Sequence, residues 1–173
     1  NIVKILLSVK GIDPSLYQRS SKSALINAFT NFNTDIINLM LEFYGNDIQS
    51  QVSELNESLR IILDTELDKK ILCSLNMTAT IIKLLEIPNI DLNYQASNYT
   101  LLTFACQTNQ LEIVSKMISN ENVDINLYES TNGNTPLIIA IENKNIQISE
   151  LLLTNPRINV NLRNCQMKTA LML

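Results

Sequence analysis

Residues 132–140 of the chain are NGNTPLIIA, a stretch with clear signals for the start of a helix. Thr135 can cap a helix by accepting a hydrogen bond from one of its first N–H groups, and Pro136 suits the first helical position because its missing N–H is not needed there. Asn145 marks a break, and a second mostly apolar pattern covers residues 146–153. The stretch therefore predicts two short consecutive helices.

The same two-helix pattern recurs along the chain. Turns that contain Asp-x-Asn or a close variant end at Asn93, Asn126 and Asn161, and looser copies end at Ser15 and Gln49. The intervals between these five positions are 34, 44, 33 and 35 residues. A period of this length is typical of stacked helical repeats. We expect one domain, 1–173, made of a half repeat (1–15), repeats 16–49, 50–93, 94–126 and 127–161, and a second half repeat (162–173).

These motifs resemble the ankyrin-repeat family. Residues 132–140 match its G-x-T-P-L-H-x-A-A opening with Ile138 in the place of His, residues 110–114 match H-x-E-I-V, and residues 123–126 match A-D-V-N. The resemblance implies an all-α solenoid of stacked antiparallel helix pairs with hairpin-like loops. Asn109 and Asn145 are expected where the family has the glycine between two helices, because Asn tolerates the left-handed conformation.

The second repeat is about ten residues longer than the others, which leaves two registers open. In the preferred register, residues 57–65 form the first helix with Leu59, Ile61 and Ile62 facing inward, and residues 78–85 form the second. Residues 66–76 are then an inserted helical segment. In the alternative register, residues 67–75 form the first helix, but Lys69 would occupy a core leucine position.

Composition excludes several kinds of chemistry. The chain has no histidine, which removes Ser-His-Asp and Cys-His catalysis and His-ligated zinc. Its net charge of −4 and dispersed basic residues argue against a nucleic-acid partner. No apolar run is long enough for membrane insertion, and three widely spaced cysteines favour a reducing compartment. We predict a cytoplasmic monomer that is not an enzyme and has no cofactor or metal.

The resemblance implies a protein partner bound on the concave surface made by the loop tips and the exposed side of each first helix. Tyrosines are expected as anchors because they bury a large rigid ring and offer a hydroxyl. The alternative is that each tyrosine packs along its neighbouring loop for structural reasons. The predicted partner-binding residues are Tyr17, Arg19, Lys22, Tyr94, Ser97, Tyr99, Gln107, Tyr128, Asn132, Asn134, Glu142, Arg163 and Gln166.

Three function classes remain at this point. The first is an interaction scaffold, favoured by the repeat match and the absence of catalytic residues. The second is a regulatory or targeting segment of a larger enzyme or channel. The third is an enzyme in its own right, for which the sequence offers no catalytic residues. Residues 1–9 are predicted to be a second helix without its first, and Met172 and Leu173 would lie inside a first helix. We therefore expect the natural chain to continue in at least one direction.

Overall fold

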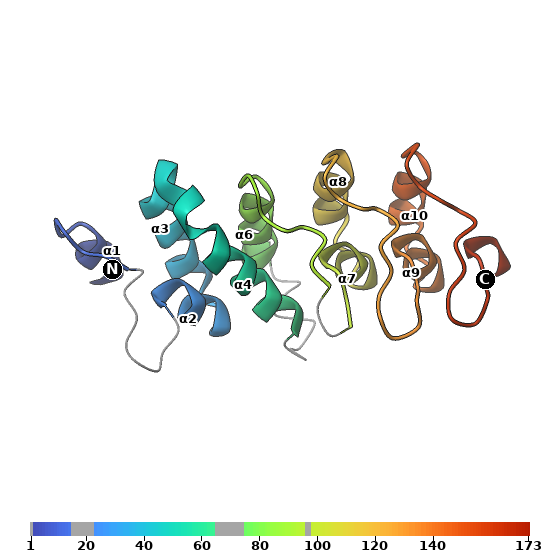
Figure 1. Ribbon diagram of the computed structural model, residues 1–173, viewed down its shortest axis with the longest axis horizontal. Coiled ribbons are helices and arrows are strands. Elements are labelled where there is room, and N and C mark those ends of the chain that lie inside the picture. The colour runs from blue at the N-terminus through green and yellow to red at the C-terminus, as the bar shows by residue number, and fades with distance from the viewer. Residues whose placement is uncertain (1, 15–22, 65–74, 96–97) are drawn as a thin grey trace. The chain divides into compact units, whose positions relative to one another are not determined.

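The computed structural model describes residues 2–14, 23–64, 75–95 and 98–173 (Figure 1). The chain divides into two compact units. Unit one consists of Asn1–Ile62 and Ser74–Ile90, and unit two of Leu63–Cys73 and Asp91–Leu173. Each unit is described by itself below.

The described part of unit two contains two complete helix pairs. The first pair is α7 (Leu101–Gln107) with α8 (Leu111–Ser119), and the second is α9 (Pro136–Glu142) with α10 (Ile146–Leu153). A single 3-10 turn, η2 (Ala170–Met172), follows. Helix α7 contacts α9 and α8 contacts α10, so the first helices form one layer and the second helices another (Figure 1). The predicted antiparallel helix pairs are confirmed.

Threonine side chains begin the first helices of unit two, as the sequence predicts. The Thr135 hydroxyl accepts a hydrogen bond of 3.3 Å from the backbone N–H of Ile138, and Pro136 takes the first helical position. At α7 the Thr100 hydroxyl accepts from the N–H of Thr103, whose own hydroxyl accepts from the N–H of Thr100. These bonds satisfy N–H groups that a helix leaves free at its start.

The core of unit two consists of the apolar faces that the repeat pattern predicts. Leu137 and Leu152 are buried, and so are the small residues Ala105, Cys106 and Ala140. Small side chains allow the first helices of successive repeats to approach closely. Burial of these faces between neighbouring pairs is what stabilises a repeat array.

The turn between paired helices corrects one expectation. Asn109 has the left-handed conformation that was predicted, with φ of 58°. Asn145 does not: its φ is −80°, and it precedes the first residue of α10. Lys144 takes the left-handed position instead, with φ of 58°, and Phe32 does so in unit one, with φ of 52°. The glycine position of the repeat is thus one residue earlier than Asn145 and is occupied by a lysine.

Unit one begins with α1 (Ile2–Leu7), α2 (Ala24–Thr30) and α3 (Thr34–Tyr44). The 3-10 helix η1 (Gly45–Gln51) joins α3 to α4 (Val52–Asp64), and α6 (Leu75–Leu85) follows. Phe29, Ile37 and Met77 are among its fully buried side chains. Ser23 caps α2, and its hydroxyl also donates to the buried carboxylate of Glu54 at 2.8 Å.

The loose turn copy that ends at Gln49 lies within a 3-10 helix. Residues 45–51 form η1, so the chain remains helical from α3 into α4. Gly45 ends α3 with φ of 42°, and the Ser50 hydroxyl closes the next turn by donating to the backbone oxygen of Asp47 at 2.7 Å. Local bonds of this kind compete with an extended loop.

The helices of the long second repeat overlap those of the preferred register. The predicted helix 57–65 corresponds to α4, which begins earlier, at Val52, and the predicted helix 78–85 corresponds to α6, which begins at Leu75. Leu59 is buried as predicted. The inserted segment 66–76 and the alternative first helix 67–75 lie almost wholly outside the described residues. The side chains of Ile61 and Ile62 are not among those that the structure describes.

No β-strand occurs in the described part of the chain, where Gln95 and Thr100 form an isolated antiparallel bridge. The all-α fold class is confirmed. None of the described helices has the length and apolar character needed to cross a membrane.

Candidate protein-binding surface

The loops that lead into the first helices of unit two form the candidate surface. We call residues 94–95 and 98–100, 127–135 and 160–169 the tip loops. Each ends at a threonine that begins a helical segment: Thr100, Thr135 and Thr169. Equivalent loops therefore meet the same end of the first helices.

Glu129 organises the tip loop 127–135 from the inside. Its side chain is buried, and its carboxylate accepts hydrogen bonds from the backbone N–H groups of Thr131 at 2.6 Å and Asn132 at 2.8 Å. The carboxylate also accepts from the backbone N–H of Asn134 at 3.1 Å, and the backbone N–H of Glu129 donates to the backbone oxygen of Asn134 at 3.0 Å. A carboxylate that is ringed by N–H donors holds its loop in one conformation.

Asn164 has the equivalent role in the tip loop 160–169. Its side-chain oxygen accepts from the N–H groups of Gln166 and Lys168, both at 3.0 Å, and its own N–H donates to the Lys168 oxygen at 3.0 Å. The amide nitrogen of Asn164 donates to the side-chain oxygen of Asn134 at 2.8 Å. Asn164 thus shapes its own loop and links it to the preceding one.

Further hydrogen bonds join successive tip loops. The backbone N–H of Ser130 donates to the backbone oxygen of Asn98 at 3.1 Å. The side-chain amide of Gln95 donates to the backbone oxygen of Tyr128 at 3.0 Å. The N–H of Cys165 donates to the Asn132 oxygen at 2.8 Å. The tip loops of unit two are therefore one braced edge and not independent loops.

The predicted binding residues divide by exposure. Tyr128 is 53% exposed, and Asn132, Glu142, Arg163 and Gln166 are also exposed. Tyr94, Tyr99 and Gln107 are half-buried. Asn134 is only 6% exposed. Four of the predicted residues lie outside the described part of the chain: Tyr17, Arg19, Lys22 and Ser97.

Contacts within the unit account for several of these side chains. The Tyr99 ring packs edge to face on Phe104, with centroids 6.1 Å apart, which supports a structural role for this tyrosine. Asn134 donates to the Glu142 carboxylate at 3.0 Å and accepts from Asn164. Because both polar ends of Asn134 are engaged and the residue is buried, we leave it out of the surface proposed below.

Sequence reasoning missed the importance of Asn98 and Met167. Asn98 accepts hydrogen bonds from Ser130 and from the Thr131 hydroxyl, so it braces two tip loops. Met167 is 63% exposed and has φ of 62°, the conformation that Gly133 has in the preceding loop. Aligning the loops on Thr135 and Thr169 would have placed Met167 at the glycine position, because Gly133 and Met167 each lie two residues before the threonine.

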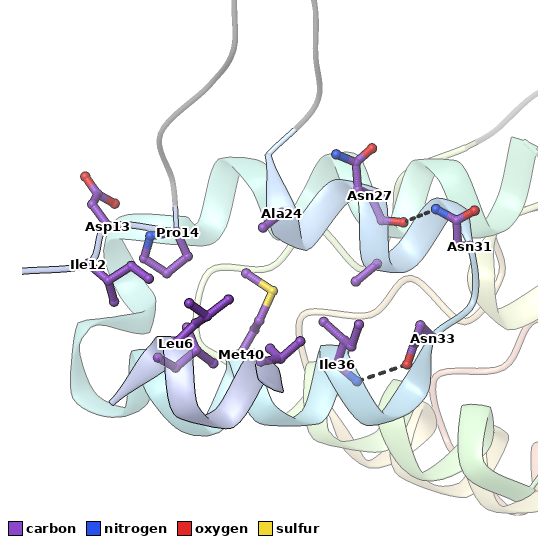
Figure 2. Close-up of a pocket in the computed structure, with 13 residues that line it drawn as sticks. Leu6, Ile12, Asp13, Pro14, Ala24, Asn27, Asn31, Asn33, Ile36 and Met40 are labelled. Atoms are coloured by element: carbon purple, nitrogen blue, oxygen red, sulfur yellow. Dashed lines mark hydrogen bonds between the residues drawn. The ribbon is translucent and has the colours of Figure 1, made fainter. Parts of the chain in front are cut away.

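A pocket of about 650 Å³ lies in unit one, between α1 and the pair α2 and α3 (Figure 2). Leu6, Ile36 and Met40 are among its apolar lining residues. The amides at its rim are engaged with nearby backbone: Asn31 donates to the Asn27 oxygen at 2.8 Å, and Asn33 accepts from the Ile36 N–H at 3.2 Å. These bonds stabilise helix ends and are not aimed at a ligand.

Among the described residues, no three His, Cys, Asp or Glu side chains gather closely enough to hold a metal ion. Burial raises the pKa of the Cys106 thiol, which disfavours a reactive thiolate there. The exposed polar edge of unit two therefore remains the strongest candidate site.

A family model for ankyrin repeats, comprising three copies, matches residues 70–164, which is more than half of the chain. The chain belongs to the ankyrin-repeat family. Ankyrin repeats are in general non-catalytic modules for protein–protein interaction, and the all-α fold of this ankyrin-repeat chain is that of the family.

Among solved structures, the ankyrin-repeat chain is similar to the ankyrin repeat domain of Bcl-3, described as a unique member of the IkappaB protein family. The sequence identity is 16% and the TM-score is 0.45, over 88% of this chain and 93% of the Bcl-3 domain. No curated protein matches the chain.

Proposed function

We propose that this ankyrin-repeat chain binds a partner protein through a surface on unit two, which we call the tip surface. It consists of tip-loop side chains together with Gln107 and Glu142, the last residues of α7 and α9. The tip-loop members are Tyr94, Tyr99, Tyr128, Asn132, Arg163 and Gln166. The predicted residues Tyr17, Arg19, Lys22 and Ser97 would extend the binding region beyond the described residues.

The observation that carries the proposal is the bracing of the tip loops. Glu129 and Asn164 hold the loops from within, and the bond from Cys165 to Asn132 connects them. Loops that are already ordered lose little conformational entropy when a partner binds. The exposed ring of Tyr128 then offers a rigid aromatic anchor on this edge.

The test is a partner capture with the intact chain and two matched variants. Tyr128→Ala removes the exposed ring and should weaken binding by about 1–3 kcal/mol. Tyr99→Ala removes the ring that packs on Phe104, so its main effect should be on stability. Circular dichroism would confirm that both variants are folded.

Lys144→Gln serves as the surface control, because Lys144 lies in the turn between α9 and α10, at the end of α9 that is distant from Thr135. It should leave capture unchanged. Equal capture by the intact chain and a folded Tyr128→Ala, Arg163→Ala double variant would contradict the proposal.

A cytoplasmic location and a monomeric state stay predictions from the sequence.

A further inference from the structure

We infer that the tip surface of unit two selects an acidic, extended segment of its partner protein. This inference deepens the proposed function and rests on it. Its starting point is a difference in charge: the whole chain carries a net charge of −4, but the exposed charged residues of the described tip loops are Arg163 and Lys168. The edge of unit two is locally basic in an acidic protein.

The interior position of Glu129 makes this charge difference possible. Glu129 is the one acidic residue in the described tip loops, and it is 3% exposed. Its two carboxylate oxygens face the N–H groups of Thr131, Asn132 and Asn134. The backbone N–H groups of the loop therefore stabilise the negative charge of Glu129 inside the loop, and the carboxylate does not lie on the surface that a partner would contact.

The two cations are held near each other by the loop that carries them. Arg163 directly precedes Asn164, whose N–H donates to the oxygen of Lys168 at 3.0 Å. Across the described residues, the ion pair that forms joins Arg60 to Glu57, so neither Arg163 nor Lys168 has a carboxylate partner there. Both cations are exposed and available to an incoming anion.

Equivalent positions place an aromatic ring beside this basic site. Tyr128 immediately precedes Glu129, and Arg163 immediately precedes Asn164, the residue with the equivalent role. Because the N–H of Cys165 bonds to the oxygen of Asn132, the two loops are neighbours. A partner segment that crosses both loops would meet a tyrosine ring and then a guanidinium group. Acidic residues next to an apolar or aromatic side chain suit this order.

Glu142 is the acidic side chain that opposes this choice. It lies at the end of α9, and its carboxylate accepts from the Asn134 amide at 3.0 Å. Glu142 would weakly repel an acidic partner. Glu142→Gln should therefore strengthen binding, whereas removing the charge of Arg163 or of Lys168 should weaken it. This opposite sign is a sharper test than loss of binding alone.

Nucleic acid is the competing anionic partner. Two exposed cations would release few counterions from a phosphate backbone, and the loops hold a single exposed aromatic ring for base stacking. A peptide carboxylate needs only one or two cationic groups, and a planar guanidinium can bind it through two hydrogen bonds. The observations favour the peptide.

The experiment uses three fluorescein-labelled twelve-residue peptides, each with one phenylalanine in a glycine and serine background. The first carries four glutamates, the second four glutamines and the third four lysines. Fluorescence anisotropy is measured with the full chain at low and at moderate salt. The glutamate peptide should bind about tenfold more tightly than either of the others at low salt, and the difference should shrink as salt is added.

Variants then locate the site. Arg163→Gln and Lys168→Gln should each weaken binding of the glutamate peptide by about two- to fivefold, the range expected for an exposed ion pair. Lys144→Gln removes the same charge from the turn between α9 and α10, outside the tip loops, and should have no effect. Glu142→Gln should strengthen binding by up to about twofold.

The outcomes separate this inference from the proposed function. Equal binding of the three peptides, or an equal loss in Lys144→Gln and Lys168→Gln, overturns the preference for acidic segments. Tighter binding of a labelled single-stranded RNA of the same net charge overturns it in favour of nucleic acid. If Tyr128→Ala still abolishes capture of a protein partner while the peptides show no preference, the proposed function stands and only the partner chemistry is wrong.

Discussion

The side-chain amide of Asn145 donates a hydrogen bond of 2.7 Å to the backbone oxygen of Cys106. Asn145 precedes α10, and Cys106 lies in the last turn of α7, so the bond joins the second helix of one pair to the first helix of the preceding pair. The last carbonyl groups of a helix have no partner within the helix. A side chain of the next repeat supplies one here.

Asn145→Ala should therefore lower the free energy of unfolding by about 1–2 kcal/mol, because it leaves the Cys106 oxygen without this donor. The measurement is a urea titration followed by circular dichroism. Asn31→Ala is a useful comparison, because the Asn31 side-chain amide donates at 2.8 Å to the Asn27 backbone oxygen within its own helix pair. A larger loss at Asn31 than at Asn145 would contradict the importance of the bond between repeats.

Lys144→Gly should stabilise the chain by about 0.5–1 kcal/mol. Lys144 is exposed and has φ of 58°, a conformation that costs a residue with a Cβ about 1–2 kcal/mol and costs glycine nothing. Part of that gain is offset by the greater entropy of glycine in the unfolded chain. Asn145→Gly, at φ of −80°, should destabilise instead. Thermal unfolding of the two glycine variants gives the sign directly.

Gly133→Ala should destabilise unit two by about 1–3 kcal/mol. Gly133 has φ of 69°, and a Cβ at this position would lie 3.0 Å from the Sγ of Cys165 and 3.3 Å from its backbone nitrogen. Cys165→Ala should recover only part of the loss, because the backbone contact and the strained φ remain. Gly11→Ala isolates the strain, since Gly11 has φ of 87° and no atom within 4 Å of its Cβ position. An equal cost at Gly11 and Gly133 would show that the close approach to Cys165 is unimportant.

Cys106 and Cys165, the cysteines in the described part of unit two, should differ in reactivity. Cys106 is buried in α7, and burial raises the pKa of its thiol, so it stays protonated and inaccessible across the neutral range of pH. Cys165 is exposed. Iodoacetamide at neutral pH should alkylate Cys165 in the folded chain and Cys106 only after unfolding, as read by mass spectrometry of tryptic peptides. Alkylation of both at one rate would mean that α7 opens readily.

The sequence alone determined the helices and the faces that they bury. Thr135-Pro136 specifies a helix start through bonds within one turn, and the apolar spacing specifies which side is buried, so α9 and α10 follow from local rules and from the repeat period. The candidate tip residues could be found in the same way, because each lies at a fixed distance from a repeat marker. Whether each of these side chains is exposed to a partner could not be found from the sequence.

Only the tertiary structure decided which of those side chains a partner can reach. Asn134 and Tyr128 are both tip residues in the sequence, yet Asn134 is buried between Glu142 and Asn164 while Tyr128 is exposed. The left-handed residue proved to be Lys144 and not Asn145, and Asn145 bonds to Cys106 in the preceding repeat. The bonds from Asn145 to Cys106 and from Asn164 to Asn134 join residues 39 and 30 positions apart, and no local pattern records them.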